Sequence, residues 1–106
     1  MTVDLIEDAD AVAAAQAFAA LGAPQRLAIL RALVRAGPAG LPVGSLGERL
    51  DVAPSTLSHH IAALVRAGLV SQTREGRSLY CRAAFDRVEG LAGFLLRECC
   101  RDEDHA

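Results

Sequence analysis

Three cysteines carry the most distinctive chemistry in this chain of 106 residues: Cys81, and Cys99 followed directly by Cys100. Neighbouring thiolates are soft ligands that suit a thiophilic centre and do not suit Mg²⁺ or Ca²⁺. A disulfide between adjacent cysteines would close a small, strained ring and distort the peptide that joins them. By residue type alone, a bound soft ligand and two buried cysteines that act as small hydrophobic side chains explain the pair equally well.

A second group of residues has the chemistry to contact a polyanion. Short hydroxyl side chains open one expected helix, from which they can reach phosphates and base edges. Two arginines flank a glycine at the tip of an expected hairpin, which suits the narrow minor groove of DNA or its phosphates. Taken singly, such residues are more often a helix cap and a solvated hairpin edge. The candidate DNA-binding residues are Ser55, Thr56, Ser58, His59, Arg74 and Arg77.

The charge distribution is compatible with this interpretation. The formal net charge is −2, yet eight of the eleven arginines lie between residues 26 and 82, where there are three acidic residues. Both ends of the chain are acidic. A basic middle fits a polyanionic partner, although a solvated surface of mixed charge explains the same numbers equally well.

The elements that must position these residues follow from apolar spacing and from glycine and proline stops. We expect helices over residues 8–21, 24–36, 45–50, 54–67 and 85–101, and strands over 69–73 and 78–82. Five helices and a two-stranded hairpin in this order, with a three-residue turn between the third and fourth helices, predict one mainly α-helical, winged helix-turn-helix domain spanning residues 1–106. We expect the buried face of the fourth helix to consist of Leu57, Ile61, Leu64 and Val65. The apolar residues at helical spacing on the other two long helices are Leu27, Leu30, Leu33 and Val34 on the second and Val88, Leu91, Leu95 and Cys99 on the last.

Several classes of protein are disfavoured by composition. No apolar run approaches the ~18 residues of a membrane span, and the first ten residues are acidic where a signal peptide would be basic. An odd number of cysteines is not a disulfide framework, so we expect a cytoplasmic protein that does not contact a membrane. We expect no enzyme, because the sequence offers no nucleophile paired with a base and no phosphate loop.

Three stretches resemble the ArsR/SmtB family of small bacterial repressors. They are the segment ALGAPQRLAIL from Ala20, the segment STLSHHIAALVRAGLV from Ser55 and the segment EGRSLY from Glu75. The resemblance implies a homodimer joined through its first and last helices, bound to palindromic double-stranded operator DNA and released by a ligand. A small domain with an Ala-rich first helix and an apolar last helix would also gain stability from pairing across a two-fold axis.

The resemblance also bears on the ligand. The family's zinc-type site needs Asp and His along the last helix, and its lead, cadmium or arsenite site needs cysteines near the third helix; the sequence has neither. A cysteine pair in the last helix resembles the sensor of arsenical-responsive members, which implies a trivalent arsenical as inducer and no permanent cofactor. Cys99 and Cys100 supply two sulfurs, enough for an organoarsenical such as methylarsenite. If Cys81 reaches the pair as a third ligand, inorganic arsenite or antimonite becomes an equal candidate.

Cys81 shares a strand face with Leu79, so its alternative role is in the core. Two other functions stay open for the same fold. One is a repressor that responds to oxidants or persulfides through Cys81 and one cysteine of the pair. The other is an architectural DNA-binding protein that senses nothing.

Overall fold

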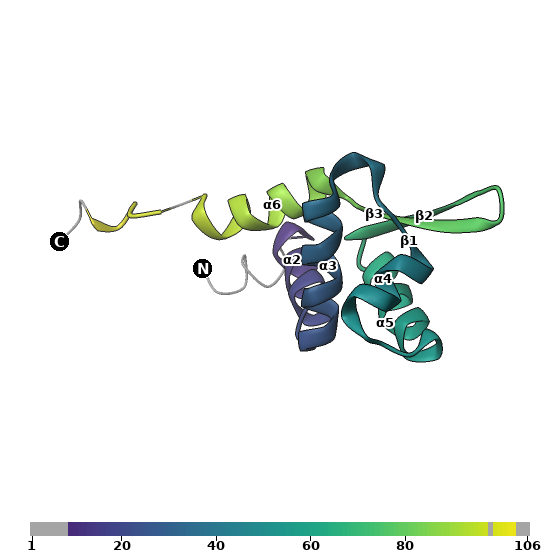
Figure 1. Ribbon diagram of the computed structural model, residues 1–106. Helices are drawn as coiled ribbons and strands as arrows, with labels where there is room; N and C mark the ends of the chain where they lie inside the picture. Colours follow the sequence, from purple (N-terminus) through teal and green to yellow (C-terminus); the bar gives the residue numbers. More distant parts are fainter. Residues whose placement is uncertain (1–8, 98, 104–106) are drawn as a thin grey trace.

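The computed structural model describes residues 9–97 and 99–103, which form a helical body, a small sheet and a projecting hairpin (Figure 1). This part of the chain confirms the mainly α-helical, winged helix-turn-helix architecture. The elements are α2 (Ala9–Ala20), α3 (Pro24–Ala36), the 3-10 turn η1 (Gly37–Ala39), β1 (Leu41–Pro42), α4 (Val43–Leu50), α5 (Pro54–Arg66), β2 (Val70–Glu75), β3 (Ser78–Ala83) and α6 (Phe85–Leu96).

The helix boundaries follow from local stereochemistry. Pro24 and Pro54 occupy the first positions of α3 and α5, where the missing N–H costs nothing and the fixed φ suits a helix. Asp51 ends α4 in the left-handed conformation, with φ 54° and ψ 50°. Gly68 follows α5 with a φ of +78°. Their left-handed backbone is incompatible with a continuing α-helix, so Asp51 separates α4 from α5 and Gly68 prevents α5 from extending further.

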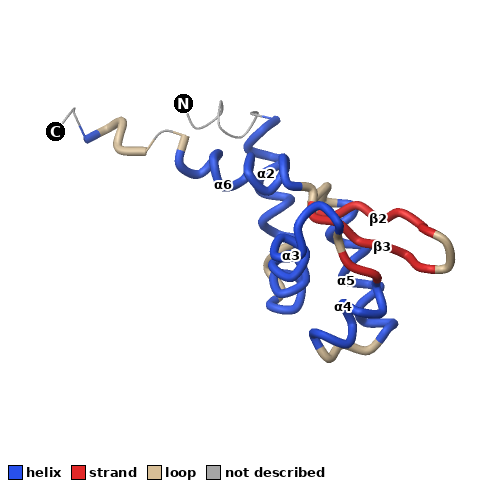
Figure 2. The backbone as a smooth tube through the Cα atoms, turned by 45° about the horizontal axis from the view of Figure 1, so that its top comes forward, coloured by secondary structure: helices blue, strands red, loops and turns tan. Residues whose placement is uncertain are grey.

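The sheet has three antiparallel strands in the order β1-β3-β2, one strand more than we expected. Leu41 lies opposite Cys81, and Pro42 lies opposite Tyr80. The extended connector after α3 thus becomes a short edge strand, because β3 has a free edge that accepts it. The hairpin of β2 and β3 extends beyond the helices (Figure 2), and we call its residues 70–83 the wing.

The core lies between α3, α4, α5 and the inner face of the sheet. Of the apolar positions expected on α3, Leu30 and Leu33 are buried, whereas Leu27 is 45% exposed and Val34 is 38% exposed. On α5, Leu57, Ile61 and Leu64 are buried, and Val65 is 38% exposed, which contradicts the expected burial of that residue. The buried arc of each helix is narrower than the apolar arc, so part of the apolar surface remains uncovered in one protomer.

The last helix is shorter than expected and projects away from the sheet (Figure 1). It ends at Leu96, not at Arg101, and of the expected apolar stripe only Leu91 is buried. Leu95 and Leu96 are 65% and 67% exposed. Cys99 and Cys100 consequently lie in a turn beyond the helix and not on its last turn.

In the described residues, no single helix is both long and apolar enough to cross a bilayer, although α2 and residues 24–39 pass that test together as a pair bent by 103°.

Candidate nucleic-acid interface and cysteine pair

The first turn of α5 presents free hydroxyls to solvent. Ser55, Thr56 and Ser58 are exposed, and the structure gives their side chains no hydrogen bond within the described part of the chain. The residue before the helix is Ala53, and no side chain caps the first amides. The alternative role as helix caps is therefore contradicted, and both hydroxyls and amides stay available for an anion.

The wing carries the predicted basic tip. Arg74 and Arg77 are exposed on either side of Gly76, whose φ of +65° permits the tight reversal between the strands. The hairpin and α5 lie at the same end of the molecule, opposite the end towards which α6 projects (Figure 1). The structure thus brings the two predicted groups of DNA-binding residues to one end.

The two histidines of α5 differ in their surroundings. His59 is exposed, as expected. His60 links α5 to the start of α3: Arg26 Nε donates to its Nδ1 at 3.0 Å, and its Nε2 lies 2.7 Å from Gln25 Oε1. Because the guanidinium can only donate, Nδ1 accepts and Nε2 carries the proton. Burial, Arg26 and His59 lower the pKa of His60, so the neutral ring is favoured.

The two adjacent cysteines place their sulfurs side by side. Cys99 Sγ and Cys100 Sγ are 3.4 Å apart, and both side chains are exposed. Two thiolate bonds of about 2.3 Å to one atom, meeting at roughly 95–110°, separate two sulfurs by about 3.4–3.8 Å. Cys100 has a left-handed φ of 62°. Hydrogen bonds with Cys99 and Glu103 raise the pKa of Cys100.

Cys81 does not lie with the pair in one protomer. Its side chain is fully buried in β3, and Gln72 Nε2 donates to its sulfur at 3.7 Å. Burial raises the pKa of the Cys81 thiol, which makes it a poor nucleophile. Between it and the pair stands α6, whose twelve residues span about 18 Å. The geometry fits the core role for Cys81.

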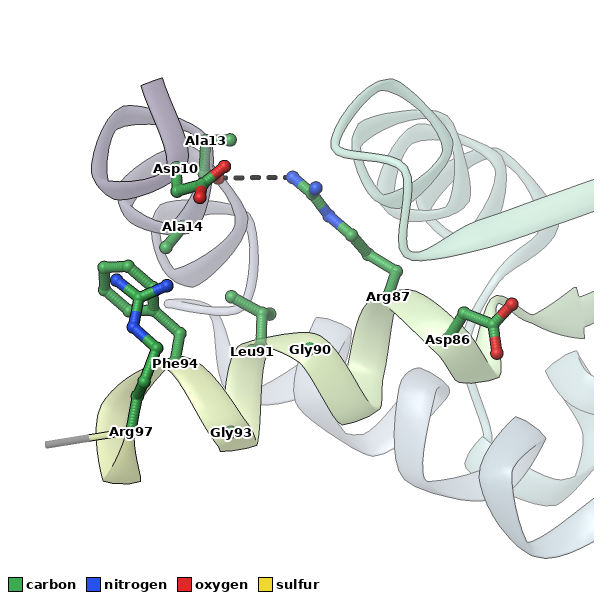
Figure 3. A pocket seen from close by; sticks show the side chains of 10 residues that line it. All are labelled: Asp10, Ala13, Ala14, Asp86, Arg87, Gly90, Leu91, Gly93, Phe94 and Arg97. Carbon is green, nitrogen blue, oxygen red and sulfur yellow. Dashed lines mark hydrogen bonds between the residues drawn. The ribbon is translucent and has the colours of Figure 1, made fainter. Parts of the chain in front are cut away.

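A groove between α2 and α6 is lined by small residues (Figure 3). Ala13 and Ala14 face it from α2, and Gly90 and Gly93 face it from α6. Arg87 joins the two helices by donating from Nη2 to the Ala13 carbonyl oxygen at 3.4 Å.

Over residues 9–97 and 99–103, no three His, Cys, Asp or Glu side chains are grouped so that they could hold a metal ion.

Comparison with known proteins places this geometry among transcriptional regulators. A family model described as a helix-turn-helix domain matches residues 21–73. The HTH-type transcriptional regulator YceK of Bacillus subtilis is 37% identical over 82 residues, which cover 76% of this chain and 81% of that protein. An ArsR-like transcriptional regulator from Rhodococcus sp. RHA1 superposes with a TM-score of 0.72 at 31% identity, covering 89% of this chain and 85% of the other. The homodimeric winged helix-turn-helix domain of Mb0332 from Mycobacterium bovis superposes with a TM-score of 0.66 at 28% identity, covering 88% and 89%.

Two features of this end of the molecule were missed by sequence reasoning. One is the link between His60 and α3, and the other is a set of hydrogen bonds from Arg82 across the wing. The bond from Arg26 to His60 spans 34 positions and the bond from Arg82 to Pro38 spans 44, so no local spacing could reveal them.

Proposed function

Because the chain belongs to the ArsR-like family of helix-turn-helix transcriptional regulators, we propose that it is a repressor that binds operator DNA as a homodimer and leaves it when a trivalent arsenical binds Cys99 and Cys100. The observation that carries the ligand assignment is the 3.4 Å separation of two exposed sulfurs. The proposal has three parts, on DNA, on the dimer and on the inducer.

DNA contact is assigned to α5 and the wing. The uncapped first turn of α5, with Ser55, Thr56, Ser58 and His59 exposed, fits insertion into the major groove. Arg74 and Arg77 then fit the phosphates or minor groove beside it. Two such units related by a two-fold axis would read the two halves of a palindrome, which is the operator we propose.

The dimer is assigned to α2 and α6. Leu95 and Leu96 are exposed on a helix that projects from the body, and Val12 and Phe18 on α2 are 45% and 38% exposed. Exposed apolar side chains grouped on two helices favour a protein partner that buries them. The similar Mb0332 domain is homodimeric, which supports a second copy of this chain as the partner.

The inducer is assigned to the cysteine pair. A trivalent organoarsenical would exchange its two hydroxyls for the two sulfurs: two As–O bonds break, two As–S bonds form, and each thiol proton leaves with a hydroxyl as water. The arsenic stays trivalent, and no thiolate is needed beforehand, which suits Cys100, whose raised pKa keeps it protonated at neutral pH. With Cys81 buried in the sheet, two sulfurs are on offer and not three. This supports an organoarsenical, whose carbon is the third substituent, over inorganic arsenite.

Release then depends on the ligand having different affinities for two arrangements of the dimer. The pair follows α6, and α6 follows β3 of the wing after one residue. A ligand that turns the end of α6 against its partner would change the distance between the two α5 helices. A coupling of about 1–3 kcal/mol would weaken DNA binding by roughly 5–150-fold.

The test is fluorescence anisotropy with the reduced protein and a labelled duplex from upstream of its own gene. Phenylarsenite, methylarsenite and arsenite are titrated against wild type, Cys99→Ser/Cys100→Ser and the control Cys81→Ala. We expect release by the organoarsenicals at a lower dose than by arsenite, retained in Cys81→Ala and lost in the double variant. Unchanged release in the double variant would refute the site.

The redox alternative requires Cys81 to react with one cysteine of the pair. Its burial and raised pKa favour the arsenical proposal over that alternative. A thiol oxidant added without arsenical separates the two: it should leave wild-type DNA binding unchanged. Release by the oxidant that disappears in Cys81→Ala would establish the redox switch instead. An architectural protein would ignore both treatments.

A further inference from the structure

The outer face of the wing carries an arginine that the DNA-binding residues above do not include. Arg82 on β3 donates from Nη2 to Glu75 Oε2 at 2.6 Å and from Nη1 to Thr73 Oγ1 at 2.7 Å. Its Nε donates to the carbonyl oxygen of Pro38 at 3.1 Å. The three bonds join both strands of the wing to the turn η1, which belongs to the helical body.

The register of the sheet explains how one side chain reaches so far. Ser71 lies opposite Arg82, Thr73 opposite Tyr80 and Glu75 opposite Ser78, so these side chains share one face. The arginine extends diagonally along that face towards the tip and crosses the ring of Tyr80, with Cζ 5.5 Å from the ring centre. Its aliphatic stem passes over Gly40, where an added Cβ would lie 2.6 Å from Arg82 Cγ.

The acidic partner of Arg82 stands where a negative charge would oppose DNA binding. Glu75 directly follows Arg74 and lies two residues from Arg77, at the tip we assign to phosphate contact. Its Oε2 also accepts a hydrogen bond from Thr73 at 3.2 Å. With Arg82 paired to it, the tip presents its two arginines without the opposing carboxylate charge.

We propose that Arg82 is the positioning residue of the wing: it anchors the hairpin to η1 and masks the charge of Glu75, so that Arg74 and Arg77 meet the DNA backbone. This inference rests on the proposed DNA binding. Arg82 acts by positioning Arg74 and Arg77 and does not itself contact DNA. An isolated surface ion pair contributes little, but this pair belongs to a network of four hydrogen bonds and a ring contact.

The affinity test uses Arg82→Gln, Glu75→Gln and the double variant on the upstream duplex over a range of salt concentrations. We expect Arg82→Gln to lower affinity about two- to fivefold, and the added Glu75→Gln to restore most of it. The comparison variant Arg77→Gln removes an assigned phosphate contact. It should lower the salt slope by about 0.9 and gain no rescue from Glu75→Gln. A double variant as weak as Arg82→Gln would overturn the masking role.

The anchoring role is tested without DNA. Amide hydrogen exchange between Thr73 and Tyr80 should quicken in Arg82→Gln, while exchange in α5 stays at the wild-type rate. Unchanged exchange in the hairpin would overturn the anchor, and equally faster exchange in α5 would mean general destabilisation. If the wild type binds no DNA, the proposed function fails, whereas the exchange result still decides the anchor.

Discussion

Gly40 offers the sharpest test of how tightly the wing is packed on the body. It has a φ of +70° and a ψ of −164°, and a Cβ there would overlap the carbonyl oxygen of Cys81 and the stem of Arg82. Gly37, three residues earlier, has nearly the same backbone, with a φ of 78° and a ψ of −166°, but nothing lies within 4 Å of its Cβ position. The two alanine variants therefore differ in the contact and hardly in the backbone.

The magnitudes follow from that comparison. A non-glycine residue in this region of backbone space costs about 1–3 kcal/mol, which applies to both variants. Gly40→Ala adds an overlap with backbone, for which forced repacking typically costs about another 1–3 kcal/mol. For a domain of this size 1 kcal/mol corresponds to about 4–8 °C in Tm. Gly40→Ala should therefore melt at least about 4 °C below Gly37→Ala.

The assay is thermal unfolding followed by far-ultraviolet circular dichroism at one fixed protein concentration, because a dimer's Tm depends on concentration. Anisotropy with the upstream duplex then follows whether Gly40→Ala also weakens DNA binding, as displacement of Arg82 requires. Equal melting temperatures for the two variants would refute the reasoning, since the steric contact is what distinguishes them.

Three further predictions concern α5, its link to α3 and the wing. Ile61→Ala should lower the free energy of unfolding by about 2–5 kcal/mol because Ile61 is fully buried, whereas Val65→Ala, at a half-exposed site, should cost far less in the same urea titration. Because the pKa of His60 is lowered in the folded protein, the unfolded chain binds a proton at this residue first as the pH falls. The free energy of unfolding should therefore be at its full value above pH ~6.5 and decrease below it. His60→Gln should make that decrease smaller in urea titrations across this pH range. Arg77→Ala should weaken binding to specific and unrelated duplexes alike, and should reduce the dependence of log K on log salt by about 0.9; a loss confined to the specific duplex would contradict a phosphate contact.

Much of the fold was predictable because it is encoded over short distances. Proline is favoured at the first position of a helix, and this local preference identified the starts of α3 at Pro24 and α5 at Pro54. Glycine at a positive φ is typical of a hairpin turn, and this identified the reversal at Gly76. The spacing of Leu57, Ile61 and Leu64 identified the buried side of α5. These features need no knowledge of the partner surfaces.

The prediction was wrong where the partner surface decides the outcome. Val65 was expected on the buried face of α5, yet it is 38% exposed because the neighbouring elements cover a narrower arc than the apolar residues occupy. The edge strand β1 forms because β3 offers it unpaired backbone groups, and the short segment Leu41–Pro42 shows no strand pattern of its own. The last helix was also predicted too long: it ends at Leu96, and because Leu95 and Leu96 are 65% and 67% exposed, burial does little to stabilise its last turn.

For the function, the sequence alone determined which chemistry the chain carries: two neighbouring sulfurs, a hydroxyl-rich helix start and a basic hairpin tip. Tertiary structure decided which of these groups act together. It buried Cys81 in the sheet, away from Cys99 and Cys100 in the same protomer, and it laid Arg82 across the wing to Glu75 and Pro38. The physical reason is that spacing reports neighbours within one element, whereas burial and hydrogen bonds between distant residues exist only once the elements have packed.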